Sequence, residues 1–177
     1  MVLPRTLLVG SGRIGSRVAE ELRRAGGEVV TLRRSAASGA DGWRHIAADL
    51  SRPLTESLPA VDAVVVTLPP GDEPDFLAGA ISRVAEALPA RPARTIWVSS
   101  TRVFEGYGDE RPLTESDEPR PRGERAQQLV DGEVRAVALL GATILRPAGI
   151  YGPGRDRLIR QVLAGADVDH DRRTNRI

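Results

Sequence analysis

Six short apolar runs recur along the chain, and polar or helix-patterned stretches separate them. They lie at residues 6–10, 28–32, 43–50, 63–68, 94–100 and 142–146. Most are rich in Val, Ile and Leu, which is typical of strands buried on both faces of a sheet. Apolar positions at helical spacing predict helices over 16–27, 73–88, 122–140 and 157–165. This alternation predicts an α/β protein with right-handed crossovers and a doubly wound parallel sheet that has helices on both faces.

Two stretches lie outside this pattern. Residues 101–121 are polar, contain several Gly and Pro and show no period, and a loop of this length in a compact domain is often functional. The tail at 167–177 completes neither a helix nor a strand. Trp43 and Trp97 lie in or beside strands, so we expect them to pack in the core.

The composition describes an ordinary soluble domain. With 177 residues, 41% hydrophobic and 28% charged, the chain suits one well-buried domain. A net charge of +1 favours neither nucleic-acid nor membrane partners. No apolar run reaches the length that crosses a bilayer, and the N-terminus has no signal-peptide pattern, so we expect a cytoplasmic protein.

Several kinds of chemistry are excluded by residue type. The chain has no Cys, which removes disulfides and thiolates, and its two histidines, His45 and His170, stand far apart. We therefore expect no metal site, and the acidic run at 109–119 is interpreted as a solvated loop. All 25 basic residues are Arg, so a lysine base or Schiff base is absent.

The glycine cluster GSGRIG at residues 10–15 lies between the first strand and the first helix. Gly10 would permit a tight turn, Gly12 a close approach of a pyrophosphate, and Gly15 close helix–strand packing. Helix-start amides would face the phosphates, and the helix dipole would favour their charge. The alternative is a strand–helix turn without a ligand. In this context the cluster predicts a Rossmann-type dinucleotide site.

The end of the second strand bears on which dinucleotide is bound. An NAD site normally has Asp or Glu there, whereas this chain has Arg33 and Arg34. A guanidinium binds a 2′-phosphate through paired charge-assisted bonds, so we predict NADP over NAD. Two solvated surface arginines remain the alternative. Asp49 could accept a bond from the adenine amino group or cap a turn, and we leave both open. The predicted cofactor-binding residues are Gly10, Ser11, Gly12, Arg13, Ile14, Gly15, Arg33, Arg34, Asp49, Leu50, Thr67, Leu68, Pro69, Ser99 and Arg146.

Two further segments carry a family resemblance together with GSGRIG: SSTRVF at 99–104 and RPAGIYGPG at 146–154. The resemblance covers essentially the whole chain. Together they resemble the extended short-chain dehydrogenase/reductase superfamily, in its NAD-dependent epimerase/dehydratase group. The resemblance implies redox chemistry at a sugar-type or related small carbonyl. It places Ser100 at the catalytic hydroxyl position, although local backbone contacts could equally use that hydroxyl. Phe104 stands where the group usually has Tyr.

The chain departs from this group at its YxxxK pair. If Glu133 matches the group's frequent glutamate after the lysine, Arg125 stands at the Tyr position and Leu129 at the Lys position. Without that pair, positioned acid–base catalysis would lose about 10²–10⁴ in rate. Tyr107 and Tyr151 are the candidate substitute proton donors, with Arg125 or Arg146 as the cation, although a loop anchor is the more ordinary role for Tyr107 and packing for Tyr151. Arg146 is also expected to order the segment after the sixth strand.

Other features leave the function open. Tyr151 is interpreted as a packing residue. Thr67 and the residues after it differ from the group's usual small-residue segment, yet should line the cofactor crevice.

Residues 1–147 are predicted to form the NAD(P)-binding domain, and residues 148–177 to begin a truncated substrate lobe. The chain is therefore a fragment, a truncated form or a short member of the group. An NADP-binding oxidoreductase or epimerase is the first hypothesis. A dinucleotide-sensing protein and an inactive fragment are the alternatives. We expect a dinucleotide and a small molecule as partners, and leave a homodimer open.

Overall fold

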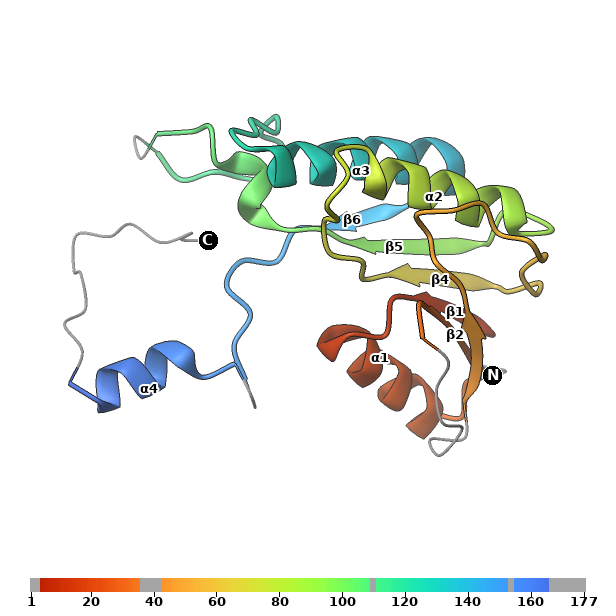
Figure 1. Cartoon of the computed structure of the whole chain (residues 1–177). Coiled ribbons are helices and arrows are strands. Elements are labelled where there is room, and N and C mark those ends of the chain that lie inside the picture. The colour runs from red at the N-terminus through yellow and green to blue at the C-terminus, as the bar shows by residue number, and fades with distance from the viewer. Residues whose placement is uncertain (1–3, 36–42, 109–110, 153–154, 166–177) are drawn as a thin grey trace.

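A single parallel sheet of six strands forms the centre of the fold (Figure 1). The computed structural model describes residues 4–35, 43–108, 111–152 and 155–165. The strands stand in the order β3-β2-β1-β4-β5-β6. Their bounds are β1 (Thr6–Val9), β2 (Val29–Arg33), β3 (Arg44–Ala47), β4 (Ala63–Val66), β5 (Arg94–Val98) and β6 (Thr143–Leu145). This order and the parallel pairing confirm the predicted doubly wound sheet.

Helices cover the two faces of the sheet. The chain forms α1 (Arg13–Arg24), α2 (Phe76–Ala87), α3 (Glu124–Leu140) and α4 (Arg157–Leu163), with a 3-10 turn η1 at Thr101–Phe104. Figure 1 shows α1 on one side of the sheet and the packed pair α2 and α3 on the other. In the same view α4 lies apart from the sheet. No helix among the described residues is long and apolar enough to span a membrane.

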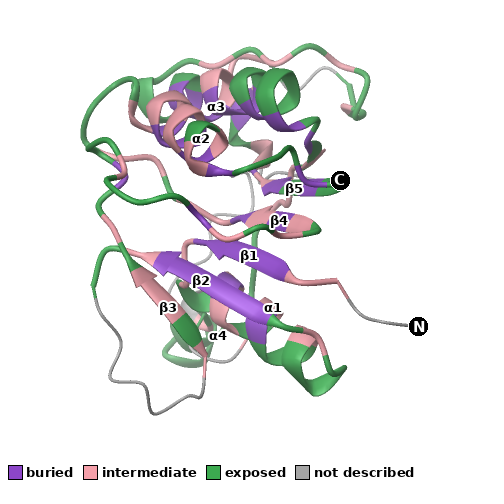
Figure 2. Ribbon diagram, turned by 90° about the vertical axis from the view of Figure 1, so that its right-hand side faces the viewer, coloured by how far each residue is buried: buried purple, intermediate pink, exposed green. Residues whose placement is uncertain are grey.

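The larger part of the core lies between the sheet and the α2–α3 pair. Leu7, Val30 and Val64 point to this side from three adjacent strands and are fully buried. Trp97 joins them from β5 with no exposed surface, as predicted. Its ring packs on Gly132 of α3, where an added Cβ would lie 2.8 Å from the indole. In Figure 2, β1 and β2 are the buried centre of the sheet, and β3 is a more exposed edge.

A smaller cluster lies under α1. Leu8 and Val29 from the sheet and Ala19 from the helix are buried, and Val18 and Leu22 pack against them. The predicted apolar face of this helix is therefore confirmed. Trp43 also packs against this cluster but is only partly buried.

The structure corrects several local predictions. The first helix begins at Arg13 rather than at residue 16, because Gly12 is its N-cap and Gly15 lies inside its first turn. The turn η1 lies within the stretch expected to be irregular. The packing role expected for Tyr151 is wrong, since its side chain is 85% exposed. The tail at 167–177 lies outside the described residues.

Candidate functional site

The strand order reverses between β1 and β4, and this is where the candidate site lies. β1 pairs with β2 on one side and with β4 on the other. The first three strands therefore extend the sheet in one direction from β1, and the last three extend it in the other. In parallel α/β sheets, ligands bind outside the carboxyl ends of the strands at such a point. Two loops meet there: the glycine turn at residues 10–15 after β1, and residues 67–71 (TLPPG) after β4.

The glycine turn is held closed by contacts that only glycine permits. Gly10 has φ +90°, a conformation that L side chains rarely adopt. A Cβ on Gly15 would lie 2.2 Å from the Gly10 carbonyl oxygen and 2.9 Å from Thr67 Oγ1. The hydroxyl of Thr67 donates to the Gly10 carbonyl at 2.7 Å, and Ser16 donates to the Ser11 carbonyl at 2.9 Å. The start of α1 is thereby drawn tightly against β1 and β4.

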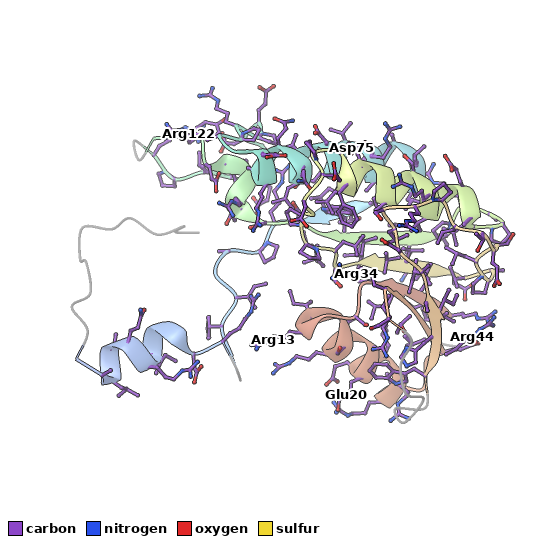
Figure 3. The ribbon with its side chains drawn as sticks, viewed as in Figure 1. Arg13, Glu20, Arg34, Arg44, Asp75 and Arg122 are labelled. Carbon is purple, nitrogen blue, oxygen red and sulfur yellow. The ribbon has the colours of Figure 1, made fainter. Side chains whose placement is uncertain are left out.

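Gly12 differs from its two neighbours because it faces open space. It is exposed, and an added Cβ would meet no atom within 4 Å. As the N-cap of α1 it gives no side-chain cap, and the first turn of the helix carries no acidic residue. Helix-start amides lack intrahelical acceptors and carry the positive end of the dipole. The turn therefore offers an anion both space and donors. Figure 3 shows Arg13 at this end of α1.

Arg33 ends β2 on the side of the turn away from β4. Its side chain is partly buried, and its Nε is buried without a hydrogen-bond partner among the described residues. A buried N–H with no acceptor is costly, and an anion at this position would satisfy it. Arg34 follows and is exposed (Figure 3). Both arginines stand at the end of β2, the strand next to β1 and its glycine turn.

Asp49 follows β3 and forms the turn-cap contact that was one of its two expected roles. The amide of Ser51 donates to its Oδ1 at 2.9 Å. This bond lowers the pKa of the Asp49 carboxyl below its usual value. The predicted contact with adenine remains a prediction, and the carboxylate is exposed and ionised for it.

At the carboxyl end of β5, the two serines of SSTRVF have different environments. Ser99 is 7% exposed, and its hydroxyl has no hydrogen-bond partner in the part of the chain that the structure describes. Its backbone amide donates to the Leu145 carbonyl at 2.7 Å. Ser100 is partly exposed and caps η1, its Oγ accepting from the Arg102 amide at 3.2 Å. The Ser100 hydroxyl thus makes the local backbone contact and still keeps its own proton to donate.

Tyr107 is an anchor of the loop after η1. Its hydroxyl donates to the Glu118 carbonyl at 3.0 Å, and its ring lies edge-on to Phe104. The guanidinium of Arg120 lies 4.3 Å from the centre of the Tyr107 ring. These contacts occupy the phenol that was considered as a substitute proton donor. Its catalytic role remains untested, and the anchoring role is what the structure shows.

An ion pair stabilises the same loop. Arg111 Nη1 and Nη2 bind the two carboxylate oxygens of Asp117, and the Thr114 amide donates to Asp117 at 2.6 Å. The Arg111 guanidinium is the main cause of a pKa of the Asp117 carboxyl far below its usual value. Arg111, Thr114 and Asp117 thus hold one another in place in the described part of the loop.

Arg146 at the end of β6 is paired with an acid from α3. Its Nη2 lies 2.6 Å from Glu133 Oε2, and its Nε donates to both carboxylate oxygens at 3.1 and 3.2 Å. The Glu133 side chain is only 5% exposed, and the Arg146 guanidinium lies 5.0 Å from the centre of the Phe104 ring. The pair joins β6, α3 and η1. It also neutralises the charge of Arg146, which weakens that residue as a catalytic cation.

Comparison with known proteins identifies the family. The sequence pattern described as the RmlD substrate binding domain matches residues 75–173. This chain belongs to that family. It is a member of the epimerase/dehydratase group of short-chain dehydrogenase/reductase-type proteins, as the motifs predicted. No curated protein matches the sequence.

Solved structures of the epimerase/dehydratase group share the fold. A protein from Methylobacillus flagellatus assigned to the NAD-dependent epimerase/dehydratases is 32% identical, with a TM-score of 0.72 over 90% of this chain and 59% of its own. MoeE5 in complex with UDP-glucose and NAD is 28% identical, with a TM-score of 0.69 over 91% of this chain and 62% of its own. The NDP-hexosamine 5,6-dehydratase TunA shares the fold at 20% identity, with a TM-score of 0.71. The chain thus spans about three fifths of the length of the structures it matches.

The sequence resemblance predicted a departure from the family's YxxxK pair at two positions, and both lie on α3. Arg125, at the expected Tyr position, is exposed. Leu129, at the expected Lys position, is 4% exposed and belongs to the hydrophobic core. The helix therefore presents no acid–base pair at these positions.

Three other predicted cofactor-binding residues, Leu50, Leu68 and Pro69, lie in different environments. Leu50 is buried in the core, and its carbonyl accepts from Arg83 at 2.9 Å. Leu68 packs partly against the core beside Gly10, while Pro69 is exposed. Among the described residues, no cluster of three or more His, Asp or Glu is placed to hold a metal ion.

Sequence reasoning missed Gln128. Its side chain is 1% exposed and pairs with the backbone of Gly71 in the loop after β4. Gln128 follows another Gln in the sequence, and its polar side chain gives no signal of burial.

Proposed function

We propose that this chain is the cofactor-binding part of an NAD(P)-dependent oxidoreductase or epimerase-type protein, and that it binds NADP in preference to NAD. The observation that carries the proposal is the contrast between three glycines of one turn. The conformation of Gly10 and the contacts of Gly15 require glycine at these positions, whereas Gly12 faces open space at a helix start that has no side-chain cap. An N-cap without a ligand would accept Ser, Thr, Asp or Asn as readily as Gly, whereas the close approach of a pyrophosphate favours glycine.

The preference for NADP is supported by Arg33. Its Nε is buried without a partner at the end of β2, where the adenosine ribose of a dinucleotide lies in this fold. A 2′-phosphate would accept from this guanidinium, and Arg34 would add a second charge. MoeE5 was solved with NAD, so a preference for NADP would be a difference in cofactor from that protein.

The chemistry that we assign to the bound cofactor is transfer of a hydride to or from a carbon next to Ser100. The Ser100 hydroxyl can donate to a substrate carbonyl while its oxygen still accepts from the Arg102 amide. Because MoeE5 binds UDP-glucose and the family pattern is described as a substrate binding domain, we propose a sugar-type or related small carbonyl as substrate of the whole protein. Residues 1–147 form the cofactor-binding part in this proposal, and residues 148–177 begin the substrate lobe.

A second candidate is a protein that binds the dinucleotide without reacting it. The observation that favours it is the state of α3, where Leu129 is buried in the core and Arg125 is exposed. The phenol of Tyr107 is also occupied by the Glu118 carbonyl. A binding protein would keep the glycine turn and the arginines and would not need the acid–base pair.

A titration with two cofactors tests the binding proposal. We expect the double substitution Arg33→Ala and Arg34→Ala to weaken NADPH binding by about 10- to 100-fold, the loss expected for charge-assisted hydrogen bonds. NADH binding should change little. Arg44→Ala is the matched control, because Arg44 is exposed on the edge strand β3. Unchanged NADPH affinity in the double variant would refute the assignment of the arginines.

Turnover separates the two candidates. Oxidation of NADPH with a carbonyl substrate, lost in Ser100→Ala with cofactor affinity retained, is the result expected for the enzyme. A protein that binds NADPH and turns over no carbonyl of the sugar-nucleotide class would support the second candidate instead.

A further inference from the structure

Residues 67–71 (TLPPG) form the side of the switch point that faces the glycine turn. They follow β4, whose last residue Val66 pairs with Val9 of β1. The Thr67 amide donates to the Val9 carbonyl at 2.9 Å, so the segment leaves the sheet directly beside the turn. Whatever lies in the crevice outside β1 and β4 must lie against it.

The first end of the segment is fastened to the glycine turn. Thr67 Oγ1 donates to the Gly10 carbonyl at 2.7 Å, and Leu68 lies within 3.2 Å of the position of a Gly10 Cβ. This hydroxyl is the only polar link that the described residues show between the side chains of the segment and the turn. The two loops therefore keep one relative position before any ligand arrives.

The second end is fastened to α3. The Gly71 amide donates to Gln128 Oε1 at 3.0 Å, and Gln128 Nε2 donates back to the Gly71 carbonyl at 3.1 Å. The Gln128 side chain is 1% exposed, so water does not replace these bonds easily if the segment moves. The ring of Phe76 closes the other side, since a Cβ on Gly71 would lie 2.6 Å from it.

Two prolines occupy the middle of the segment. Pro69 and Pro70 have fixed φ angles and no amide to donate. A stretch that is held at both ends and stiff between them loses little conformational freedom when it contacts a ligand. Preorganisation of this kind raises affinity by lowering the ordering cost of binding.

We propose that Gln128 and Thr67 are positioning residues for the bound dinucleotide, and that Gln128 acts on its nicotinamide half. This inference rests on the proposed function. The strands run β2, β1, β4, β5, so a dinucleotide whose adenosine lies at Arg33 and whose pyrophosphate lies at the glycine turn continues past residues 67–71 toward Ser100. Gln128 thus connects α3 to the cofactor crevice one residue before the buried Leu129.

Gln128→Met tests the inference, because Met has a similar length and removes both hydrogen bonds. We expect NADPH to bind about threefold to tenfold more weakly, as for the loss of ordinary hydrogen bonds. Binding of 2′,5′-ADP, which contains only the adenosine half, should stay unchanged. Gln127→Met is the matched control, since Gln127 is exposed and its amide donates to Asp131 on the same helix.

Thr67→Val tests the other end. It should weaken both NADPH and 2′,5′-ADP, because it releases the glycine turn, and Thr67→Ser should restore both. Thr95→Val is its control, a buried threonine whose hydroxyl has no partner. Hydrogen exchange of the Gly71 amide in the protein without ligand checks the fastening directly, and it should speed up in Gln128→Met.

The outcomes are distinct. Loss of NADPH affinity with unchanged 2′,5′-ADP affinity in Gln128→Met supports the inference. Equal weakening of both ligands, or no weakening of either, overturns it and leaves the proposed function intact. A wild-type protein that binds neither ligand refutes the proposed function, and the inference falls with it.

Discussion

One added methyl group should lower the stability of the fold at Gly15 and the affinity for the cofactor at Gly12, two glycines of the same turn. In Gly15→Ala the new Cβ would lie 2.2 Å from the Gly10 carbonyl oxygen, whereas ordinary van der Waals contact begins near 3.4 Å. The obstacle is backbone, so either the turn or α1 must move by about an ångström. Overpacking of this kind costs about 1–3 kcal/mol, and the rigid surroundings place this case near 3 kcal/mol. At about 2–4 °C per kcal/mol for a chain of this size, the Tm should fall by about 6–12 °C.

Gly12→Ala is the matched variant. Its Cβ meets nothing within 4 Å, and φ −70° is accessible to Ala. The free energy of unfolding should fall by about 1 kcal/mol, the typical cost of placing Ala at an N-cap. The methyl group does occupy the space proposed for the pyrophosphate, so NADPH affinity should fall by at least about tenfold.

Thermal melts followed by circular dichroism and a fluorescence titration of NADPH measure both quantities on each variant. The reasoning is refuted if Gly15→Ala has the same Tm as the wild type, or if Gly12→Ala binds NADPH as tightly as the wild type.

Two other predictions concern ion pairs. Glu133→Ala should lower the free energy of unfolding in a denaturant melt by about 3–5 kcal/mol, because it leaves the Arg146 guanidinium partly buried without its acid. The double variant with Arg146→Met should recover part of that loss. Equal losses in the single and double variants would contradict this prediction. The pKa of the Asp117 carboxyl is lowered in the folded chain. The stability that its pair with Arg111 contributes is therefore complete above the pKa of Asp in the unfolded chain, about 3.9. It is lost as the pH falls through the lower pKa of the folded chain. Protection factors of the loop amides, in which each exchange rate is corrected for the intrinsic rate at the same pH, should be lower at pH 3 than at pH 6 in the wild type and should change much less in Asp117→Asn. An equal change in both would exclude the pair as its cause.

Much of the fold follows from local pattern. The unbroken apolar runs TLLV and AVVV are strands β1 and β4, and the alternation of strands with helices led directly to the parallel sheet. Buried strands of this kind leave few alternatives, because both faces must be apolar. The start of α1 was misplaced by three residues, since the helix begins within the glycine cluster rather than after it.

The parts of the site that the sequence did not reveal depend on long-range contacts. Thr67 meets Gly10 and Gln128 meets Gly71, each across 57 residues, and no periodicity encodes such a pair. Tyr107 was recognised as a loop anchor in outline, but its partner Glu118 was not. From the sequence, Glu133 was used only to align α3 with the YxxxK pair. The structure shows it as the buried partner of Arg146.

The ratio of NADPH to NADH affinity in the wild-type protein tests the central claim most directly. Both dissociation constants should be measured at one fixed ionic strength, because salt screens the contribution of exposed arginines. The account predicts stoichiometric binding of NADPH at least about tenfold tighter than NADH, through Arg33 and the open face of Gly12. Equal affinity for the two would contradict the assignment of NADP, and binding of neither would contradict the dinucleotide site itself.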